Sequence, residues 1–252
     1  MYPGPAVRQH GSGRRKTMVM TGPGPAVNRH HNGGYHCGLL GRPGQTSKGA
    51  SRALATFLID LAPHDMQRRL DDALNVYVDA MAYPRGTESQ RASMWIDHTR
   101  RRGWRAVAAV EAETRAGEVP AAEHLAAAPM LGVAYGYQGA PDQWWQQQVV
   151  RGLHRVGFPR DESARLMGDY FELTELHIHP SAQGRGLGEA LARRLLADRA
   201  EANVLLSTPE TNGESNRAWR LYRRLGFVDI IRGYHFAGDP RAFAILGRTL
   251  PL

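Results

Sequence analysis

Cysteine is nearly absent from this 252-residue chain, in which Cys37 is the single example. One cysteine excludes an intramolecular disulfide framework and a metal site built from several thiolates. The chain also lacks any apolar run of about 18 residues, the length needed to span a membrane. The basic residues 14–16 are followed by only three apolar residues, which is too few for a signal peptide. We therefore expect a cytoplasmic protein with no membrane partner.

Acidic residues are missing from the first 50 positions, which hold seven Arg or Lys and no Asp or Glu. The rest of the chain has 25 basic and 24 acidic residues, so most of the net charge of +8 belongs to the N-terminal segment. Because the body is nearly neutral, it gives no reason to expect a nucleic-acid-binding surface. Lysine is rare as well, since 30 of the 32 basic residues are arginine, a bias typical of GC-rich bacterial genes.

Residues 1–50 contain few large aliphatic side chains but 11 Gly and 5 Pro. Such a segment buries too little apolar surface to offset the entropy lost on ordering, so we predict a disordered basic extension. Its Pro-Gly-Pro-Ala-Val sequence occurs twice, at 3–7 and 23–27. The favoured interpretation is an unstructured leader or a translation start assigned too early. The alternative is a basic arm that touches nucleic acid or anionic lipid.

From residue 53 to residue 252 the hydrophobic pattern predicts one mixed α/β domain. The predicted strands are 57–61, 104–110, 130–137, 170–178, 204–207, 227–236 and 242–250. The predicted helices are 64–82, 87–101, 187–200 and 216–225. Two insertions interrupt this order: the alanine-rich residues 112–129, whose structure the pattern does not predict, and residues 138–169, which we expect to carry a helix.

The most informative segment runs from Leu176 to Gly188, where a strand ends and Gln-Gly-Arg-Gly-Leu-Gly opens a helix. Glycine allows positive φ and a close approach of a ligand to the backbone. The first N–H groups of a helix lack intrahelical partners and lie at its positive end, so the segment predicts a pyrophosphate site. A Walker loop would need a lysine, and the dinucleotide fingerprint would need glycine in place of Glu189. A glycine-rich loop without a ligand is the alternative.

This Gln-x-x-Gly-x-Gly pattern, preceded by a strand and Ile-x-Pro, resembles the coenzyme A loop of the GCN5-related N-acetyltransferases. Residues 216–227 look like the second signature of that family, an Asn followed by a helix that carries Leu-Tyr and ends in Gly-Phe. The resemblance is specific over residues 170–236, rests on element order over 53–137 and does not extend to 1–50. It implies a mainly antiparallel central sheet flanked by helices, in a single domain.

The resemblance further implies acetyl-CoA as co-substrate, an amine acceptor and no metal. The implied coenzyme-binding residues are Leu176, His177, Ile178, Gln183, Gly184, Arg185, Gly186, Leu187, Gly188 and Asn216. Backbone N–H groups of the loop would take the pyrophosphate, and the pantetheine arm would pair with 176–178 like an extra strand. The Leu176 N–H would point at the thioester oxygen. Asn216 would touch the pantetheine, although helix capping alone would explain it.

In this family an amine attacks the thioester directly, within a ternary complex. Tyr222 stands where the family places a tyrosine that can protonate the departing thiolate, with core packing as the alternative. Glu172 stands where relatives keep a general base. Simple strand alternation predicts Glu172 on the same face as Leu176, opposite Glu175 and His177. Glu175, His177 or no protein base at all are the alternatives.

Two functions follow from these implications. The first is an N-acetyltransferase that acts on a small-molecule or protein amine, and the second is a non-catalytic acyl-CoA-binding module. Antibiotic, polyamine, peptide N-terminus and lysine acceptors all stay open. Homodimers are common in the family, so a second copy of the chain is a partner to test.

The adjacent residues Trp144 and Trp145 are the most conspicuous feature of the 138–169 insertion. On a helix they point about 100° apart and do not easily face one core. We expect one to pack the insertion onto the domain and the other to wall the acceptor pocket or a dimer contact. The alternative is that both are buried in a local core.

Overall fold

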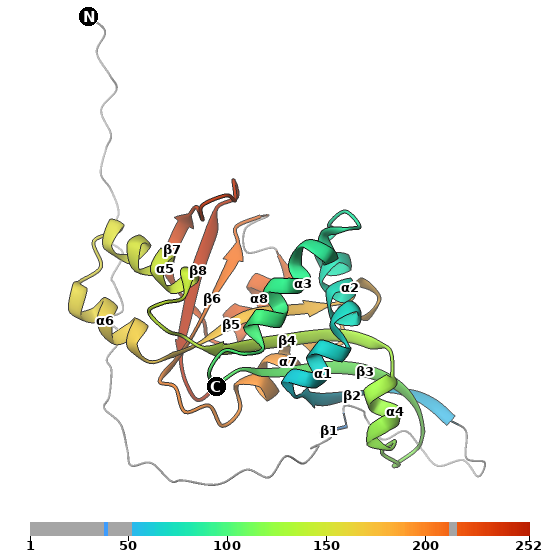
Figure 1. The fold of residues 1–252 in the computed structure, drawn as a ribbon. Helices are drawn as coiled ribbons and strands as arrows, with labels where there is room; N and C mark the ends of the chain where they lie inside the picture. Colours follow the sequence, from blue (N-terminus) through green and yellow to red (C-terminus); the bar gives the residue numbers. More distant parts are fainter. Residues whose placement is uncertain (1–37, 40–51, 212–215) are drawn as a thin grey trace, which may run out of the picture. The chain divides into compact units, whose positions relative to one another are not determined.

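An eight-stranded sheet runs through the part of the chain that the computed structural model describes, which is residues 38–39, 52–211 and 216–252 (Figure 1). The strands are β1 (Gly38–Leu39), β2 (Arg52–Leu61), β3 (Arg105–Arg115), β4 (Met130–Gln138), β5 (Tyr170–Ile178), β6 (Asn203–Pro209), β7 (Val228–Tyr234) and β8 (Phe243–Thr249). Their spatial order is β1-β2-β3-β4-β5-β6-β8-β7, and every neighbouring pair is antiparallel except β5–β6. The mixed, mainly antiparallel α/β fold is thus confirmed.

Helices flank this sheet on both faces. They are α1 (Pro63–Arg68), α2 (Leu70–Met81), α3 (Thr87–His98), α4 (Ala122–Ala127), α5 (Trp144–Arg155), α6 (Arg160–Gly168), α7 (Leu187–Leu196) and α8 (Arg217–Arg224), with a short 3₁₀ helix at Pro180–Ala182. Among the described residues, no helix is long and apolar enough to cross a membrane. Within the predicted N-terminal extension the structure describes only Gly38–Leu39, which pair with β2. The rest of residues 1–50 lies outside the described residues.

The predicted helix 64–82 is two helices, because Arg69 interrupts it. Its backbone leaves helical geometry at φ −107° and ψ 20°, and its side chain turns inward. The guanidinium donates to the carbonyl of Ala128 at 2.7 Å and to the carboxylate of Asp72 at 2.9 Å. The hydrophobic periodicity continues through this residue, so the pattern alone could not reveal the break.

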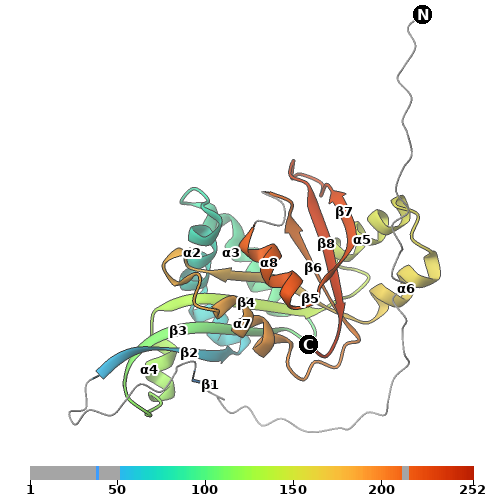
Figure 2. The same ribbon diagram turned by 180° about the vertical axis from the view of Figure 1, so that it is seen from behind.

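Three buried clusters hold the layers together. Helices α1–α3 cover the β2–β5 half of one face, which is the face in front in Figure 1. Helices α5 and α6 pack beside β7 and β8, around Trp145, Tyr170 and Ile245. Helices α7 and α8 cover the opposite face, in front in Figure 2, where Leu191 and Trp219 are fully buried.

Strand β5 contains one extra residue opposite β4. Tyr135 pairs with Glu175, but the next residue, Gly136, pairs with Leu173, so Thr174 has no partner in the ladder. Such a bulge bends a strand and interrupts its side-chain alternation. On its other edge β5 pairs with β6 only over residues 170–172. From Leu173 onward, therefore, the edge of β5 that faces β6 is not used by the sheet.

Glycine is needed opposite the bulge. A β carbon on Gly136 would lie 2.1 Å from the carbonyl oxygen of Glu172 and 2.5 Å from the Phe171 ring. Both distances are far inside van der Waals contact, so the backbones of β4 and β5 approach more closely here than any larger residue allows.

Gly136→Ala should lower the free energy of unfolding by roughly 1–3 kcal/mol, the usual cost of overpacking a buried site. Urea denaturation measures this loss. Gly168→Ala is the matched control, because a β carbon there meets no atom within 4 Å. The control should be neutral or slightly stabilising, and equal stability of the two variants would contradict the close approach.

Candidate active site

The loop between β5 and α7 presents an open helix N-terminus. Gly184 and Gly186 have φ of +82° and +80°, and a β carbon on either would meet nothing within 4 Å. Residues 184–186 are exposed, and Gly186 directly precedes the first turn of α7. This end of α7 therefore offers free N–H groups and a positive dipole to an anion.

The side chains of this loop turn away from that opening. Gln183 donates through Nε2 to the carbonyl of Ile178 at 3.2 Å, and its Oε1 accepts from Arg217 at 2.9 Å. Arg185 lies 3.1 Å from Glu111 on β3, and Leu187 is buried in the core. The side chains of Gln183, Arg185 and Leu187 therefore stabilise the fold around the loop. The part of the loop that is open to a ligand is its backbone.

Strand β5 has free main-chain groups next to this loop. The His179 N–H donates to the carbonyl of Leu131 at 2.8 Å. In an antiparallel pair alternate residues face the neighbouring strand, so the same side of the ladder contains His177. The N–H groups of Leu176 and Ile178 then point away from β4, toward the edge that β6 has left. Their side chains pack on the α7 side of the sheet.

The faces of β5 differ from the simple alternation that the sequence suggested. Glu172, Glu175 and His177 pair with Tyr137, Tyr135 and Val133 of β4, respectively. Since these three β4 residues alternate regularly, Glu172, Glu175 and His177 share one face. The prediction that Glu172 lies with Leu176 and opposite Glu175 is wrong, because the extra residue Thr174 shifts the alternation by one.

Glu172 is a buried carboxyl with an incomplete set of partners. It is 4% exposed, and its Oε1 accepts from the Tyr137 hydroxyl at 3.3 Å. Its Oε2 is buried without a partner among the described residues. Burial raises the pKa of Glu172 to about 8, although the positive charge of Arg101 and the Tyr137 hydrogen bond act in the opposite direction. A carboxyl with this pKa can accept a proton near neutral pH.

Glu175 and His177, the alternative bases, bind each other. His177 Nε2 lies 2.5 Å from Glu175 Oε2, and the His177 ring packs edge-on against Tyr77 of α2, with centroids 5.0 Å apart. The His177 side chain is therefore on the α2 side of the sheet, away from α7. Within the described ranges, no group of three or more His, Cys, Asp or Glu could hold a metal ion.

Tyr222 and Asn216 both lie on or next to α8. The Asn216 side chain accepts from the Ala218 N–H at 2.8 Å, so it caps the helix as predicted. Tyr222 is 7% exposed and packs against Phe227, with ring centroids 5.6 Å apart. Burial raises the pKa of the Tyr222 phenol, and the negative charge of Glu175 adds a smaller increase. Tyr222 thus keeps its proton, and its hydroxyl has no hydrogen-bond partner among the described residues.

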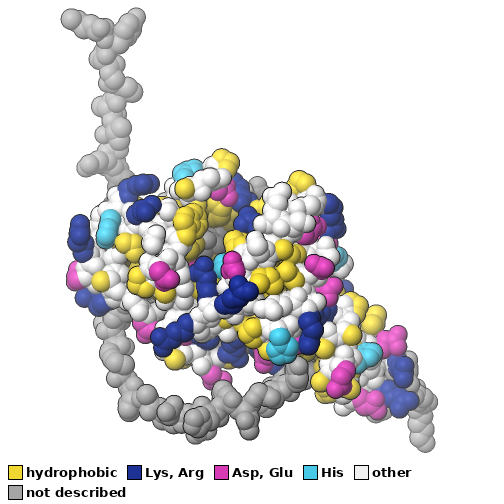
Figure 3. All heavy atoms as spheres, viewed as in Figure 1, with side chains coloured by type: hydrophobic (Ala, Val, Ile, Leu, Met, Phe, Trp, Pro, Cys, Tyr) yellow, Lys and Arg dark blue, Asp and Glu magenta, His cyan; other side chains and the backbone are white. Residues whose placement is uncertain are grey.

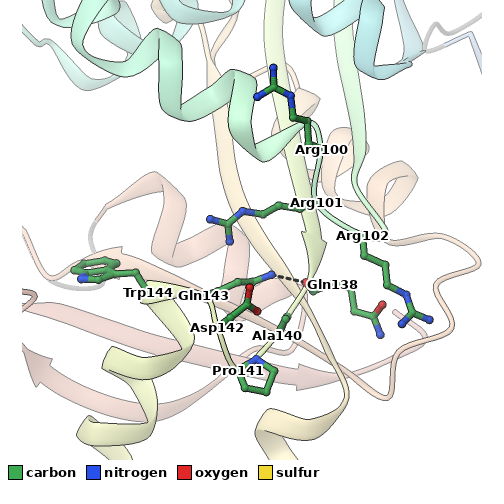
Figure 4. A pocket seen from close by; sticks show the side chains of 10 residues that line it. Arg100, Arg101, Arg102, Gln138, Ala140, Pro141, Asp142, Gln143 and Trp144 are labelled. Atoms are coloured by element: carbon green, nitrogen blue, oxygen red, sulfur yellow. Dashed lines mark hydrogen bonds between the residues drawn. The ribbon is translucent and has the colours of Figure 1, made fainter.

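A pocket of about 830 Å³ opens beside this site (Figure 4). Arg100, Arg101 and Arg102 line one side, and residues 138–144 line the other. Arg101 lies over the Tyr137 ring, 4.6 Å from its centroid, and Tyr137 in turn binds Glu172. The sequence patterns do not predict this pocket, although three consecutive arginines between a helix and a strand are a visible signal of it.

The two tryptophans of residues 138–169 have different environments. Trp145 is buried and donates to the Ser207 hydroxyl at 3.2 Å, which anchors α5 to β6. Trp144 is 51% exposed, lines the pocket and contacts Phe236, with ring centroids 5.6 Å apart. They do not share a core, so the alternative in which both are buried together is wrong.

Two loops from distant parts of the chain meet beside the site. Arg241, before β8, donates to the Tyr83 hydroxyl between α2 and α3 at 2.8 Å. Asp239 holds the same guanidinium at 2.6 Å. Figure 3 shows that this face of the molecule is hollowed, with basic side chains at the lower edge of the hollow.

The chain is similar to known acetyltransferases. A family model described as an acetyltransferase (GNAT) domain matches residues 144–229. A GCN5-like protein acetyltransferase of Mycobacterium tuberculosis is 76% identical, over 79% of this chain and 100% of the relative. Among solved structures, Arabidopsis thaliana NAA60 in complex with acetyl-CoA is 15% identical, with a TM-score of 0.49 over 78% of this chain and 99% of that one. A Bacillus cereus acetyltransferase of the GNAT family is 12% identical, with a TM-score of 0.46 over 77% and 96%. The identity to the mycobacterial relative shows that this chain belongs to the GCN5-related N-acetyltransferase family.

Proposed function

We propose that this acetyltransferase moves the acetyl group of acetyl-CoA to a primary amine by direct attack within a ternary complex. The observation that carries this proposal is Glu172, a buried carboxyl with a pKa of about 8 at the point where β5 and β6 part. The name of the mycobacterial relative favours a protein amine as acceptor. We therefore rank lysine and peptide N-termini above antibiotics and polyamines.

The chain has suitable groups for each part of the coenzyme. The exposed N-terminus of α7 and the open space at Gly184 and Gly186 fit a pyrophosphate. The unused edge of β5 at 176–178 fits the amide groups of a pantetheine arm, which would pair like a strand. Asn216 satisfies the first turn of α8 with its side chain, so capping accounts for it without a coenzyme contact.

Glu172 would take the proton of the attacking amine. An ordinary carboxyl with a pKa of about 4.3 is poorly matched to an ammonium of about 10.4, and the higher pKa of Glu172 narrows this difference. Proton transfer would leave Glu172 neutral, which its buried site favours. The neutral amine nitrogen then bonds to the acetyl carbon, the carbon–sulfur bond breaks, and the second proton lost by the nitrogen as the amide forms ends on the departing thiolate.

Leu176 and Tyr222 would act on the charges that develop during this step. Acetyl-CoA supplies the activated acetyl group as a thioester. The Leu176 N–H, which points to the open edge of β5, would stabilise the carbonyl oxygen, and one aligned donor of this kind contributes about 3–4 kcal/mol. The protonated Tyr222 hydroxyl would donate to the departing thiolate.

An amine panel tests the proposal most directly. Thiol release from acetyl-CoA should require the enzyme and an amine, with lysine-containing peptides included beside polyamines and aminoglycosides. Acetyl-CoA binding without thiol release on any amine would instead indicate the non-catalytic acyl-CoA-binding module and contradict the proposal.

Gly186→Glu should weaken acetyl-CoA binding at least ten-fold by calorimetry, since it places a carboxylate beside the proposed pyrophosphate site. Gly117→Glu is the matched control, because Gly117 also has a positive φ, of +84°, and open space around it. The control carries a similar backbone strain outside the loop, between β3 and α4, and should bind normally. Equal affinities of the two variants would rule out this loop as the pyrophosphate site.

Tyr222→Phe should lower kcat and kcat/KM together, by roughly 10- to 100-fold, and leave acetyl-CoA affinity unchanged. The reason is that the hydroxyl acts on charge that exists only in the transition state. Because this hydroxyl binds no described residue, thermal stability should also be unchanged. Wild-type turnover, with chemistry shown to be rate-limiting, would leave Tyr222 with packing alone.

If Glu172 is the base, kcat/KM of the wild type should rise with pH around pH 8, and Glu172→Gln should abolish this rise. Relative to the wild type, the same variant should become more stable as pH rises from 6 to 8, because the wild type loses stability over this range. Below pH 8 the folded wild type binds a proton at Glu172 that the unfolded chain has released, so folding loses about 1.4 kcal/mol per pH unit between pH 6 and pH 8 relative to the variant. Urea denaturation at several pH values measures this difference.

Glu175→Gln is the control for the kinetic measurement. A larger loss of the pH dependence of kcat/KM in Glu175→Gln than in Glu172→Gln would identify Glu175 as the base.

A further inference from the structure

The pocket beside the site has one cation directed into it. Figure 4 shows Arg101 extended toward Gln143 and Trp144, whereas Arg100 and Arg102 point away from these residues. Arg100 is engaged elsewhere, since it lies 2.9 Å from Asp97. We refer to this space, between Arg101 and residues 138–144, as the Arg101 pocket.

Arg101 has no carboxylate partner among the described residues. Its guanidinium is supported from one side by the Tyr137 ring, at 4.6 Å from the centroid. Asp142 is the single acidic residue that lines the pocket, and it is exposed. A half-buried guanidinium held on an aromatic face keeps its N–H fork available, and that fork matches a carboxylate in bidentate geometry.

The Arg101 pocket is connected to the reaction centre through Tyr137. The ring of Tyr137 supports Arg101, and its hydroxyl donates to Glu172 at 3.3 Å. Arg101 is close enough for its charge to lower the pKa of Glu172. Tyr137 and Glu172 do not line the pocket themselves, but Tyr137 contacts both Arg101 and Glu172, so we expect the groups next to an amine bound at Glu172 to lie near Arg101.

The size and walls of the pocket fit a segment of polypeptide. Its volume of about 830 Å³ exceeds the need of a single side chain and lies in the range of sites that enclose drug-sized ligands. Trp144 supplies an apolar wall toward which Arg101 extends, and Phe236 packs against Trp144 with ring centroids 5.6 Å apart. A short extended segment could place one acidic side chain on Arg101 and an apolar one on Trp144.

We propose that the Arg101 pocket binds an acidic residue next to the acceptor lysine of a polypeptide, so that the enzyme prefers lysines with Asp or Glu neighbours. This inference rests on the proposed amine acetylation and adds the sequence context of the acceptor. Arg101 acts here as a specificity-determining residue, and Glu172 remains the base.

Two lysine peptides that differ only in flanking Asp or Asn residues test the proposal. The wild type should use the acidic peptide with a KM roughly ten-fold lower, the effect expected of one charge-assisted hydrogen-bonded pair. Arg101→Gln should remove this preference. The ratio of the two KM values is compared within each variant, so any effect of Arg101 on Glu172 cancels. Arg165→Gln, on α6, removes the same charge from a distant exposed site and should keep the preference.

A binding measurement separates this inference from the proposed function. The same peptides with lysine replaced by alanine are titrated by calorimetry into enzyme saturated with coenzyme A, where no turnover is needed. Tighter binding of the acidic peptide to the wild type, lost in Arg101→Gln, would support the binding of an acidic residue in the Arg101 pocket. This result does not depend on the proposed acetylation. Equal affinity for both peptides, or a preference that survives Arg101→Gln, would overturn the inference.

Discussion

One extra residue in β5 determines where the groups of the site lie. Because Thr174 has no partner on β4, the side-chain alternation of β5 shifts there, and Glu172 comes to the same face as Glu175 and His177. The strand leaves β6 just past Glu172, which frees the backbone of residues 176–178 for other contacts. Gly136 makes the close approach of β4 possible at this point. In a regular strand Glu172 would lie on the opposite face from Glu175 and His177.

In the proposed mechanism, the burial of Glu172 favours reactivity and costs stability. Its carboxyl has one buried oxygen without a partner, and the low polarity around it raises its pKa to about 8. A more complete set of hydrogen bonds would stabilise the ionised form and lower the pKa, which would weaken it as a base. The positive charge of Arg101 partly offsets this increase in the pKa of Glu172, although Arg101 does not pair with the carboxylate.

Sequence reasoning found the features that depend on local chemistry. The glycine loop, the Asn216 cap and the order of strands follow from spacing and residue type, and the structure contains all three. The face of Glu172 was missed, because an unpaired residue changes nothing in the hydrophobic pattern. The Arg101 pocket was missed for a different reason: its two sides are brought together only by the pairing of β3 with β4 and by the contact of Arg101 with Tyr137.

The scarcity of lysine has a chemical consequence for the proposed acetylation of amines. Both lysines, Lys16 and Lys48, precede the described domain, whose many ion pairs are made by arginine and histidine. A guanidinium stays protonated in proteins, so it is not a nucleophile toward a thioester. From residue 49 onward the sequence therefore offers no lysine amine to the proposed reaction, and Lys16 and Lys48 are its two lysines.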